Sequence, residues 1–254
     1  MILQALFKRL FHMKEMILVL SLMTLACLPI ALGDIVRDAG VSLLLPLTLL
    51  GAILAWLLTV LGARKLLSGF VLLILGPLAL YIRIGQLGDA AFEFIKQLLD
   101  LIPAFFNQLF YEAPLDTAVF ISSKDGLMQN VFAFGGRITL WFTGMIHGVQ
   151  IEDPVVRTLI WSMGLWLIAV WAGWQMYRNK SFMSGMLPST IVLAFVIDYT
   201  GGEQSILWLH MTLLLFLYGL TNYDNLQTYW NTSRTDYAES TSIDTLMLVG
   251  AITF

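Results

Sequence analysis

Apolar residues occur along this chain in long runs that short polar and charged segments separate. About 20 residues pass without a charge between Arg157 and Arg178, which is the length one helix needs to cross the hydrocarbon of a bilayer. Runs of similar character occupy residues 16–32, 41–61, 66–84, 181–197 and 205–220, and a shorter run begins at Ile243 and reaches Phe254. The pattern predicts an all-α integral membrane protein, a bundle of six complete transmembrane helices plus a partial seventh, with amphipathic interfacial helices on the extracytoplasmic side.

The same pattern divides the chain into consecutive segments with different relations to the membrane. We expect a basic amphipathic N-terminal segment (1–15), three transmembrane helices (16–84), an extracytoplasmic amphipathic region (85–157), three further transmembrane helices (158–220), a cytoplasmic loop (221–242) and the start of another span (243–254). Residues 1–13 carry apolar side chains on one side and basic ones on the other, as in a helix that lies on a membrane surface. A disordered cytoplasmic start is the alternative.

The region 85–157 is the longest one without a predicted span. Polar residues between 89 and 111 recur at steps of three, four and seven, which makes one polar stripe on a helix opposite a face of Phe, Leu and Ile. This pattern predicts a helix that lies in the outer interface and bends at Pro103, with a pore or re-entrant hairpin as the alternative. Residues 122–126 (SSKDG) indicate a turn, and 131–149 predict a second interfacial or half-inserted helix.

Two other local signals concern the spans themselves. Gly76 and Pro77 predict a bend in the third span, because proline lacks the backbone N–H that would complete the helix. Small residues recur every four positions at Gly51, Ala55 and Thr59, and again at Ala169 and Gly173, so each set forms a ridge that lets another helix approach closely. We interpret both ridges as packing surfaces within the bundle rather than as specific dimerisation motifs.

Basic residues give the orientation, because short loops rich in Lys and Arg stay in the cytoplasm. The bias favours a cytoplasmic N-terminus. On the cytoplasmic side this topology places Lys8, Arg9, Lys14, Arg64, Lys65, Arg178, Lys180 and Arg234; on the outer side it places Arg37, Arg83, Lys96, Lys124, Arg137 and Arg157, most of them in the long region 85–157.

Composition leads to the same class. Hydrophobic residues make up 58% of the chain and charged residues 12%, against roughly 25% charged residues in soluble domains. The expected partners are therefore the lipid bilayer and other membrane helices. A net charge of −3 argues against nucleic acid as a partner, and the single cysteine, Cys27, permits neither an internal disulfide nor a cysteine metal cluster.

Candidate chemistry is confined to one residue. The histidines His12, His147 and His210 are far apart and have no metal-site spacing. His210 lies inside a span, where an ionisable residue is a functional candidate by default, so it is a weak candidate for binding a metal or a pigment. It could equally hydrogen-bond to a neighbouring helix. The residues predict no catalytic group, no metal site and no cofactor.

A family resemblance rests on short motifs in the second half of the chain. They are RITLW at 137–141, WAGW at 171–174 with Tyr177 and Arg178, Leu187 with Pro188, Trp230 with Asp236 and Tyr237, and Ile243 with Asp244. Together they make residues 134–254 resemble the N-terminal membrane region of bacterial transglutaminase-like membrane proteins. In that family the membrane region precedes an extracytoplasmic domain, similar to transglutaminases and papain-like proteases, with a Cys-His-Asp triad.

The resemblance implies a role for this chain but supplies no triad residue, because Cys27 lies in the first predicted span. The expected function is therefore a non-catalytic membrane anchor. An accessory subunit of a larger membrane complex, such as an energy-transducing or pigment-binding one, is the alternative, and a transporter is third. Residues 243–254 would rise only about 18 Å as a helix, against roughly 30 Å of hydrocarbon, so we expect the natural chain to continue beyond Phe254.

Overall fold

The computed structural model describes residues 13–33, 40–111, 117–149, 151–202 and 204–233. Several expectations lie outside these residues: the amphipathic segment up to residue 12, most of the polar link at 33–40, the later part of the loop at 221–242 and the partial seventh span at 243–254.

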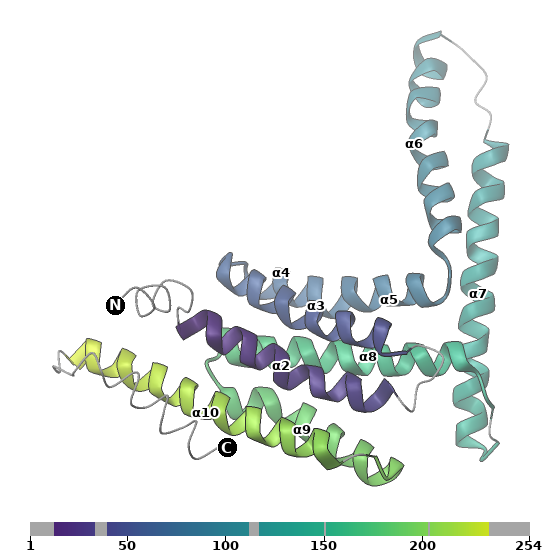
Figure 1. Cartoon of the computed structure of the whole chain (residues 1–254). Coiled ribbons are helices and arrows are strands. Elements are labelled where there is room, and N and C mark those ends of the chain that lie inside the picture. Colours follow the sequence, from purple (N-terminus) through teal and green to yellow (C-terminus); the bar gives the residue numbers. More distant parts are fainter. Residues whose placement is uncertain (1–12, 34–39, 112–116, 150, 203, 234–254) are drawn as a thin grey trace. The chain divides into compact units, whose positions relative to one another are not determined.

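The described residues are helical and contain no strand, which confirms the all-α class (Figure 1). The helices are α2 (Met13–Gly33), α3 (Gly40–Val60), α4 (Lys65–Phe70), α5 (Gly76–Ile84), α6 (Gly88–Tyr111), α7 (Ala118–Ile146), α8 (Pro154–Gly173), α9 (Phe182–Thr200) and α10 (Gln204–Ser233). Two short π-helices join neighbouring helices: η1 (Val71–Leu75) links α4 to α5, and η2 (Trp174–Arg178) follows α8.

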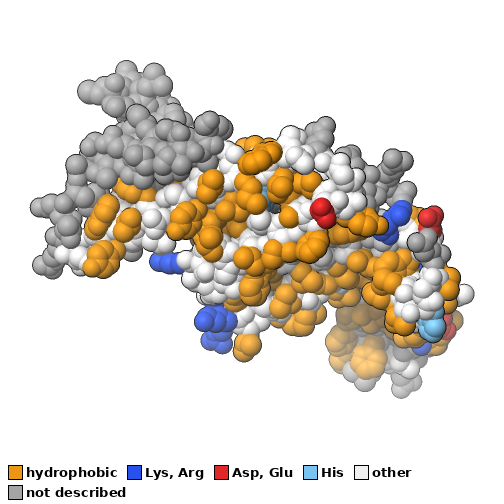
Figure 2. All heavy atoms as spheres, turned by 90° about the horizontal axis from the view of Figure 1, so that it is seen from below, with side chains coloured by type: hydrophobic (Ala, Val, Ile, Leu, Met, Phe, Trp, Pro, Cys, Tyr) orange, Lys and Arg blue, Asp and Glu red, His pale blue; other side chains and the backbone are white. Residues whose placement is uncertain are grey.

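Six helical stretches in the described part of the chain are long and apolar enough to cross a membrane. They are Glu15–Gly33, Val41–Val60, Lys65–Ile84, Pro154–Arg178, Phe182–Thr200 and Gln204–Gln227. Each corresponds to one of the six predicted complete spans, and α6 and α7 are not among them. Figure 2 shows hydrophobic side chains spread over the visible surface with few charged ones between them, as expected for helices whose solvent is lipid.

The chain divides into two compact units, which we call unit 1 (residues 1–72 and 164–254) and unit 2 (residues 73–163). In unit 1, α2 packs against α3, α9 and α10, and α3 also packs against η2 (Figure 1). Leucine, alanine and methionine side chains from α2, α3, the second half of α8, η2, α9 and α10 form one apolar core, for example Leu25, Ala52, Ala169, Met186 and Leu217.

The two small-residue ridges pack against each other, which confirms their interpretation as packing surfaces. A methyl group added at Gly51 would lie 3.2 Å from the Cβ of Ala169, and one added at Gly173 would lie 2.8 Å from the Cβ of Ala55. Contacts this short leave no room for a larger side chain, so α3 approaches the end of the α8–η2 span as closely as two backbones allow.

In unit 2, α6 and α7 lie side by side as a helical hairpin (Figure 1). The rings of Phe94 and Phe120 are 5.5 Å apart across the pair. Near the base of the hairpin Leu87, Phe134 and Leu159 form a small buried cluster, and the ring of Tyr81 lies 4.8 Å from that of Phe134. Helix α6 agrees with the helix expected at 89–111 and continues through Pro103.

Two local predictions were wrong. The turn expected at 122–126 does not form, because α7 runs through it as one helix of 29 residues. The hydroxyl of Ser123 donates to the carbonyl of Phe120 within the helix, so it does not compete with the helical backbone as it would in a turn. The loop expected from residue 221 is helical as far as Ser233, and there the ring of Trp230 packs edge-on against that of Tyr223 at 6.3 Å.

Candidate functional site

His210, the one ionisable residue singled out within a span, is fully buried where α2, α9 and α10 meet. Its Nδ1 lies 3.1 Å from the backbone oxygen of Thr24 on α2. Its Nε2 lies 3.0 Å from the hydroxyl oxygen of Thr190 on α9. Both ring nitrogens therefore contact a neighbouring helix, which is the helix-linking arrangement considered for this residue.

The two partners determine how the ring is protonated. A backbone carbonyl can only accept, so the Nδ1 of His210 must carry the hydrogen that Thr24 receives. In the neutral ring Nε2 is then an acceptor, and the hydroxyl of Thr190 must donate to it. That hydroxyl also lies 3.0 Å from the carbonyl of Met186, and its single hydrogen can serve only one acceptor at a time. A metal or pigment could reach Nε2 only by displacing Thr190.

A second polar link compensates for the proline in the third span. In a π-helix the carbonyl of residue i accepts from the N–H of residue i+5, and for Leu72 in η1 that residue is Pro77, which has no N–H. The indole Nε1 of Trp166 on α8 donates to this carbonyl at 2.8 Å. A tryptophan 94 positions away in the chain thus supplies the donor that Pro77 lacks.

Arg178 closes the end of unit 1 at which the short loop joins α3 to α4. Its Nη2 donates to the carbonyl of Ala63 at 2.9 Å, and its Nη1 donates to the hydroxyl of Ser68 at 3.3 Å. The guanidinium also lies over the ring of Trp174, 4.7 Å from its centroid. The residue that predicts orientation in the sequence therefore also fixes the adjacent loop.

Unit 2 has its own charged link at the start of α8. Arg137 on α7 donates two hydrogen bonds of 2.8 Å to the carboxylate of Asp153, and the same carboxylate accepts from the backbone N–H groups of Val155 and Val156. The Arg137 guanidinium, together with these N–H groups, holds the pKa of the Asp153 carboxyl below its usual range. Asp153 is thus both the N-cap of a membrane-spanning helix and the anchor of α7.

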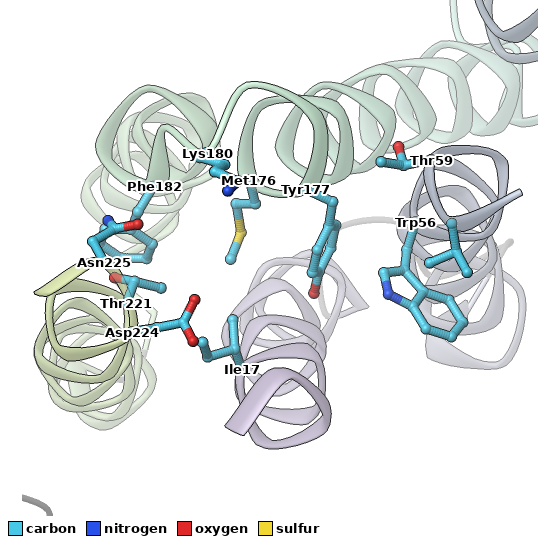
Figure 3. Close-up of a pocket in the computed structure, with 11 residues that line it drawn as sticks. Ile17, Trp56, Thr59, Met176, Tyr177, Lys180, Phe182, Thr221, Asp224 and Asn225 are labelled. Carbon is cyan, nitrogen blue, oxygen red and sulfur yellow. The ribbon is translucent and has the colours of Figure 1, made fainter. Parts of the chain in front are cut away.

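A cavity of about 390 Å³ lies at one end of unit 1 (Figure 3). It lies among the ends of α2, α3, η2, α9 and α10. Its lining consists of Ile17, Trp56, Thr59, Val60, Met176, Tyr177, Lys180, Phe182, Thr221, Asp224 and Asn225. The cavity is thus of the size of ordinary ligand sites and combines apolar walls with a few polar groups.

The floor of this cavity is tightly held and its rim is open. Ile17, Met176 and Phe182 are each 8% exposed, whereas Val60 at the rim is 63% exposed. The hydroxyl of Tyr177 crosses to α2 and bonds to the hydroxyl of Ser21 at 2.7 Å. Because Ser21 donates its own hydrogen to the carbonyl of Leu18, Tyr177 is the donor in this pair.

Sequence reasoning did not bring these cavity residues together, although it used some of them for other purposes. Lys180 was an orientation marker, Thr59 belonged to a packing ridge, and Asp224 fell in the expected loop. Their convergence depends on how five elements associate, and the sequence carries no local signal for that. The only available hint was that Trp56 and Tyr177 are amphipathic aromatic residues near span ends.

The described residues hold no group of three or more His, Cys, Asp or Glu side chains that could bind a metal ion. His147 is exposed at the end of α7, where its Nδ1 lies 2.7 Å from the carbonyl of Thr143. His12 lies outside the described residues. Comparison of the chain with protein-family models, with curated proteins and with solved structures finds no match.

Proposed function

We propose that this chain is the non-catalytic membrane anchor of a transglutaminase-like membrane protein, with its N-terminus in the cytoplasm of a bacterium and the partner domain on the outer side of the inner membrane. One observation carries the proposal. Three polar side chains inside unit 1 bond to neighbouring helices: His210 to α2 and α9, Tyr177 to Ser21, and Trp166 to the carbonyl of Leu72.

This use of polar side chains favours a structural role over transport. A substrate or proton pathway needs intramembrane polar groups that can exchange partners along a route. Here the three links join particular neighbouring helices, and the small-residue contact brings α3 close against the α8–η2 span. A bundle whose helices are linked by such hydrogen bonds suits an anchor, because an anchor must hold its spans in a fixed arrangement while another domain catalyses the reaction.

Two further observations support the orientation and the family. Arg178 and the loop residues Arg64 and Lys65 belong to the same end of unit 1, since Arg178 donates to the carbonyl of Ala63. Basic residues gathered at one end are the mark of a cytoplasmic face. Part of the family resemblance lies in the WAGW motif, and Gly173 of this motif makes the close contact with α3. In a membrane region of this family the motif would serve helix packing.

The decisive experiment is to read the coding sequence past residue 254 and to measure the mass of the protein extracted from membranes. The proposal expects a longer product whose added residues include Cys, His and Asp at triad spacing. Replacing that cysteine should abolish acyl-transfer activity in membranes and leave the amount of membrane-bound protein unchanged. A product that ends at residue 254 would exclude the anchor role.

An accessory subunit of a larger membrane complex is the second candidate, and the exposed apolar side chains of unit 2 favour it. Phe92 on α6 is 70% exposed and Phe132 on α7 is 71% exposed, and further Leu, Ile and Phe side chains accompany them on both helices. Extraction in a mild detergent followed by cross-linking at Phe92 distinguishes the two roles. A stoichiometric protein partner supports the subunit, and cross-links to lipid alone support the anchor.

A further inference from the structure

We propose that Arg178, Arg64 and Lys65 bind the phosphate of an anionic phospholipid at the end of unit 1 where a short loop joins α3 to α4. This goes beyond the anchor role, which needs no ligand. Arg178 is tied to that loop, because it donates to the carbonyl of Ala63 and to the hydroxyl of Ser68. Arg64 and Lys65 follow Ala63 directly in the chain, so the three cations belong to one small region of the protein.

The guanidinium of Arg178 is fixed and still has hydrogen bonds to give. Ser68, one of its acceptors, is fully buried, and the ring centroid of Trp174 lies 4.7 Å from the guanidinium carbon. A guanidinium has five N–H groups in a planar fork, and Ala63 and Ser68 use two of them. The other three have no acceptor within the described part of the chain. A fixed fork with free N–H groups matches two oxygens of a phosphate.

Arg64 and Lys65 add charge that the described part of the chain does not neutralise. Both side chains are exposed, and neither forms a hydrogen bond or an ion pair with another described residue. Among the same residues Arg178 also has no carboxylate partner. Three cations in one small region repel one another, and an anion bound between them relieves that repulsion. The charge of the site therefore selects an anionic ligand.

The site lies at the depth where a bilayer has its phosphates. Arg178 is the last residue of the Pro154–Arg178 span, and Lys65 is the first residue of the Lys65–Ile84 span. The Val41–Val60 span ends just before the loop. Because the ends of membrane-spanning stretches lie among the lipid head groups, a lipid of this leaflet reaches the site by lateral diffusion.

Apolar side chains beside the cations favour a lipid over a soluble phosphate. Leu61 at the end of α3 is 68% exposed, and Leu66, next to Lys65, is 90% exposed. A soluble anion would contact the basic groups and leave these leucines uncovered. A lipid carries both kinds of group, so its acyl chains can cover the leucines while its phosphate contacts the cations.

The charges also distinguish two phospholipids with the same phosphate. Phosphatidylethanolamine carries an ammonium beside its phosphate, and Arg64 and Lys65 would repel that ammonium. Phosphatidylglycerol carries a neutral glycerol in its place, so the negative charge of its phosphate acts on the cations without an opposing group. The site should therefore prefer phosphatidylglycerol.

The test uses the chain purified in a non-ionic detergent, mixed with equal amounts of the two lipids and measured by native mass spectrometry. We expect the phosphatidylglycerol adduct to exceed the phosphatidylethanolamine adduct by roughly tenfold, the effect of one charge-assisted contact. Equal adducts, or a preference for phosphatidylethanolamine, would overturn the proposal. Excess glycerol phosphate is added in a separate measurement. If it displaces the lipid, the ligand is a soluble phosphate and the lipid assignment is wrong.

A pair of double variants separates the site from overall charge and from folding. Arg64→Gln with Lys65→Gln removes two exposed side chains that hold no other described group, so the thermal transition should not change. The phosphatidylglycerol adduct should decrease by roughly tenfold. The control, Lys124→Gln with Lys180→Gln, removes the same charge from α7 and from the cavity lining, where Figure 3 shows Lys180. It should keep the adduct. An equal decrease in both double variants would mean that overall charge alone attracts the lipid, which contradicts the site.

A second pair of variants keeps the charge and tests the guanidinium. Arg178→Lys loses the planar fork, so it cannot hold the loop and two phosphate oxygens together. We expect the phosphatidylglycerol adduct to decrease several-fold and the phosphatidylethanolamine adduct to stay the same. Lys180→Arg, two residues later in the chain, is the control and should change neither adduct. Full retention of the phosphatidylglycerol adduct in Arg178→Lys would show that the guanidinium does not hold the phosphate.

Discussion

Gly173→Ala tests whether the close contact of α3 with the α8–η2 span holds unit 1 together. Gly173 has ordinary right-handed helical angles, φ −59° and ψ −42°, so alanine can adopt the backbone without strain. The new methyl carbon would lie 2.8 Å from the Cβ of Ala55 and 3.0 Å from the carbonyl oxygen of Ala52. Carbon atoms pack at about 3.5–4.0 Å, so the two helices would have to separate by about 1 Å.

The expected magnitude follows from two opposing effects. Overpacking a tight contact costs roughly 1–3 kcal/mol. Alanine in place of glycine in a helix contributes about 1 kcal/mol in the other direction. Gly173→Ala should therefore lower the free energy of unfolding by about 0–2 kcal/mol. Gly164→Ala is the matched control in the same helix, because a methyl there meets nothing within 4 Å and only the favourable effect of about 1 kcal/mol remains.

The assay is reversible unfolding in mixed detergent micelles as the fraction of sodium dodecyl sulfate rises, followed by tryptophan fluorescence and circular dichroism. The two alanine variants should differ by about 1–3 kcal/mol, with Gly173→Ala the less stable. Equal shifts in both variants would refute the reasoning, because they would mean that α3 does not approach Gly173 in the folded protein.

Three further predictions concern the polar links and the topology. Thr190→Val keeps the side-chain shape but removes the hydroxyl that bonds to Nε2 of His210, so it should lower the free energy of unfolding by about 1–3 kcal/mol in the same assay. The control Thr200→Val, at the exposed end of α9, should lower it little. With the native cysteine replaced, an impermeant thiol reagent on intact cells should label cysteine placed at Asp125 and not at Leu66, which is 90% exposed; labelling at Leu66 alone would reverse the orientation. Asp153→Asn should lower stability by no more than about 1 kcal/mol, because the arginine that pairs with it is half-exposed. The pKa of the Asp153 carboxyl is lowered in the folded state, so its contribution to stability is present above the unfolded pKa and is lost as pH falls through the folded pKa. The difference in thermal stability between wild type and Asp153→Asn should therefore shrink below about pH 4 and should not shrink when the pH is raised.

The hydropathy pattern was sufficient to locate the six spans in the sequence, because each span is a single local run of apolar residues. It was less informative about where helices begin and end. The fourth span was expected to begin at Thr158, after a charge, but α8 begins at Pro154 because Asp153 caps it. Aspartate followed by proline is a helix-start signal, so attention to capping would have found this boundary. Helix α10 continues beyond its apolar run to Ser233. A hydropathy pattern locates the part of a helix that can lie in the membrane and does not locate the end of the helix.

The contacts between spans depend on partners far away in the chain. The ridges at Gly51 and Gly173 were visible in the sequence, but nothing in it showed that they pack against each other. His210 was singled out correctly as unusual, yet one of its partners is the backbone carbonyl of Thr24, 186 positions away, which any residue could have supplied. The cavity needed the association of five elements, so no single stretch of sequence could indicate it.

The hydrogen bond from Trp166 to Leu72 has a consequence for how the protein is made. Spans enter the membrane in order of synthesis, and the third span carries a carbonyl that its own helix cannot satisfy because of Pro77. Until α8 has been synthesised and has docked, that carbonyl faces lipid or a substitute donor, at a cost of several kcal/mol in hydrocarbon. The first three spans are therefore an incomplete intermediate, and a chain interrupted before residue 166 should be a substrate for membrane quality-control proteases.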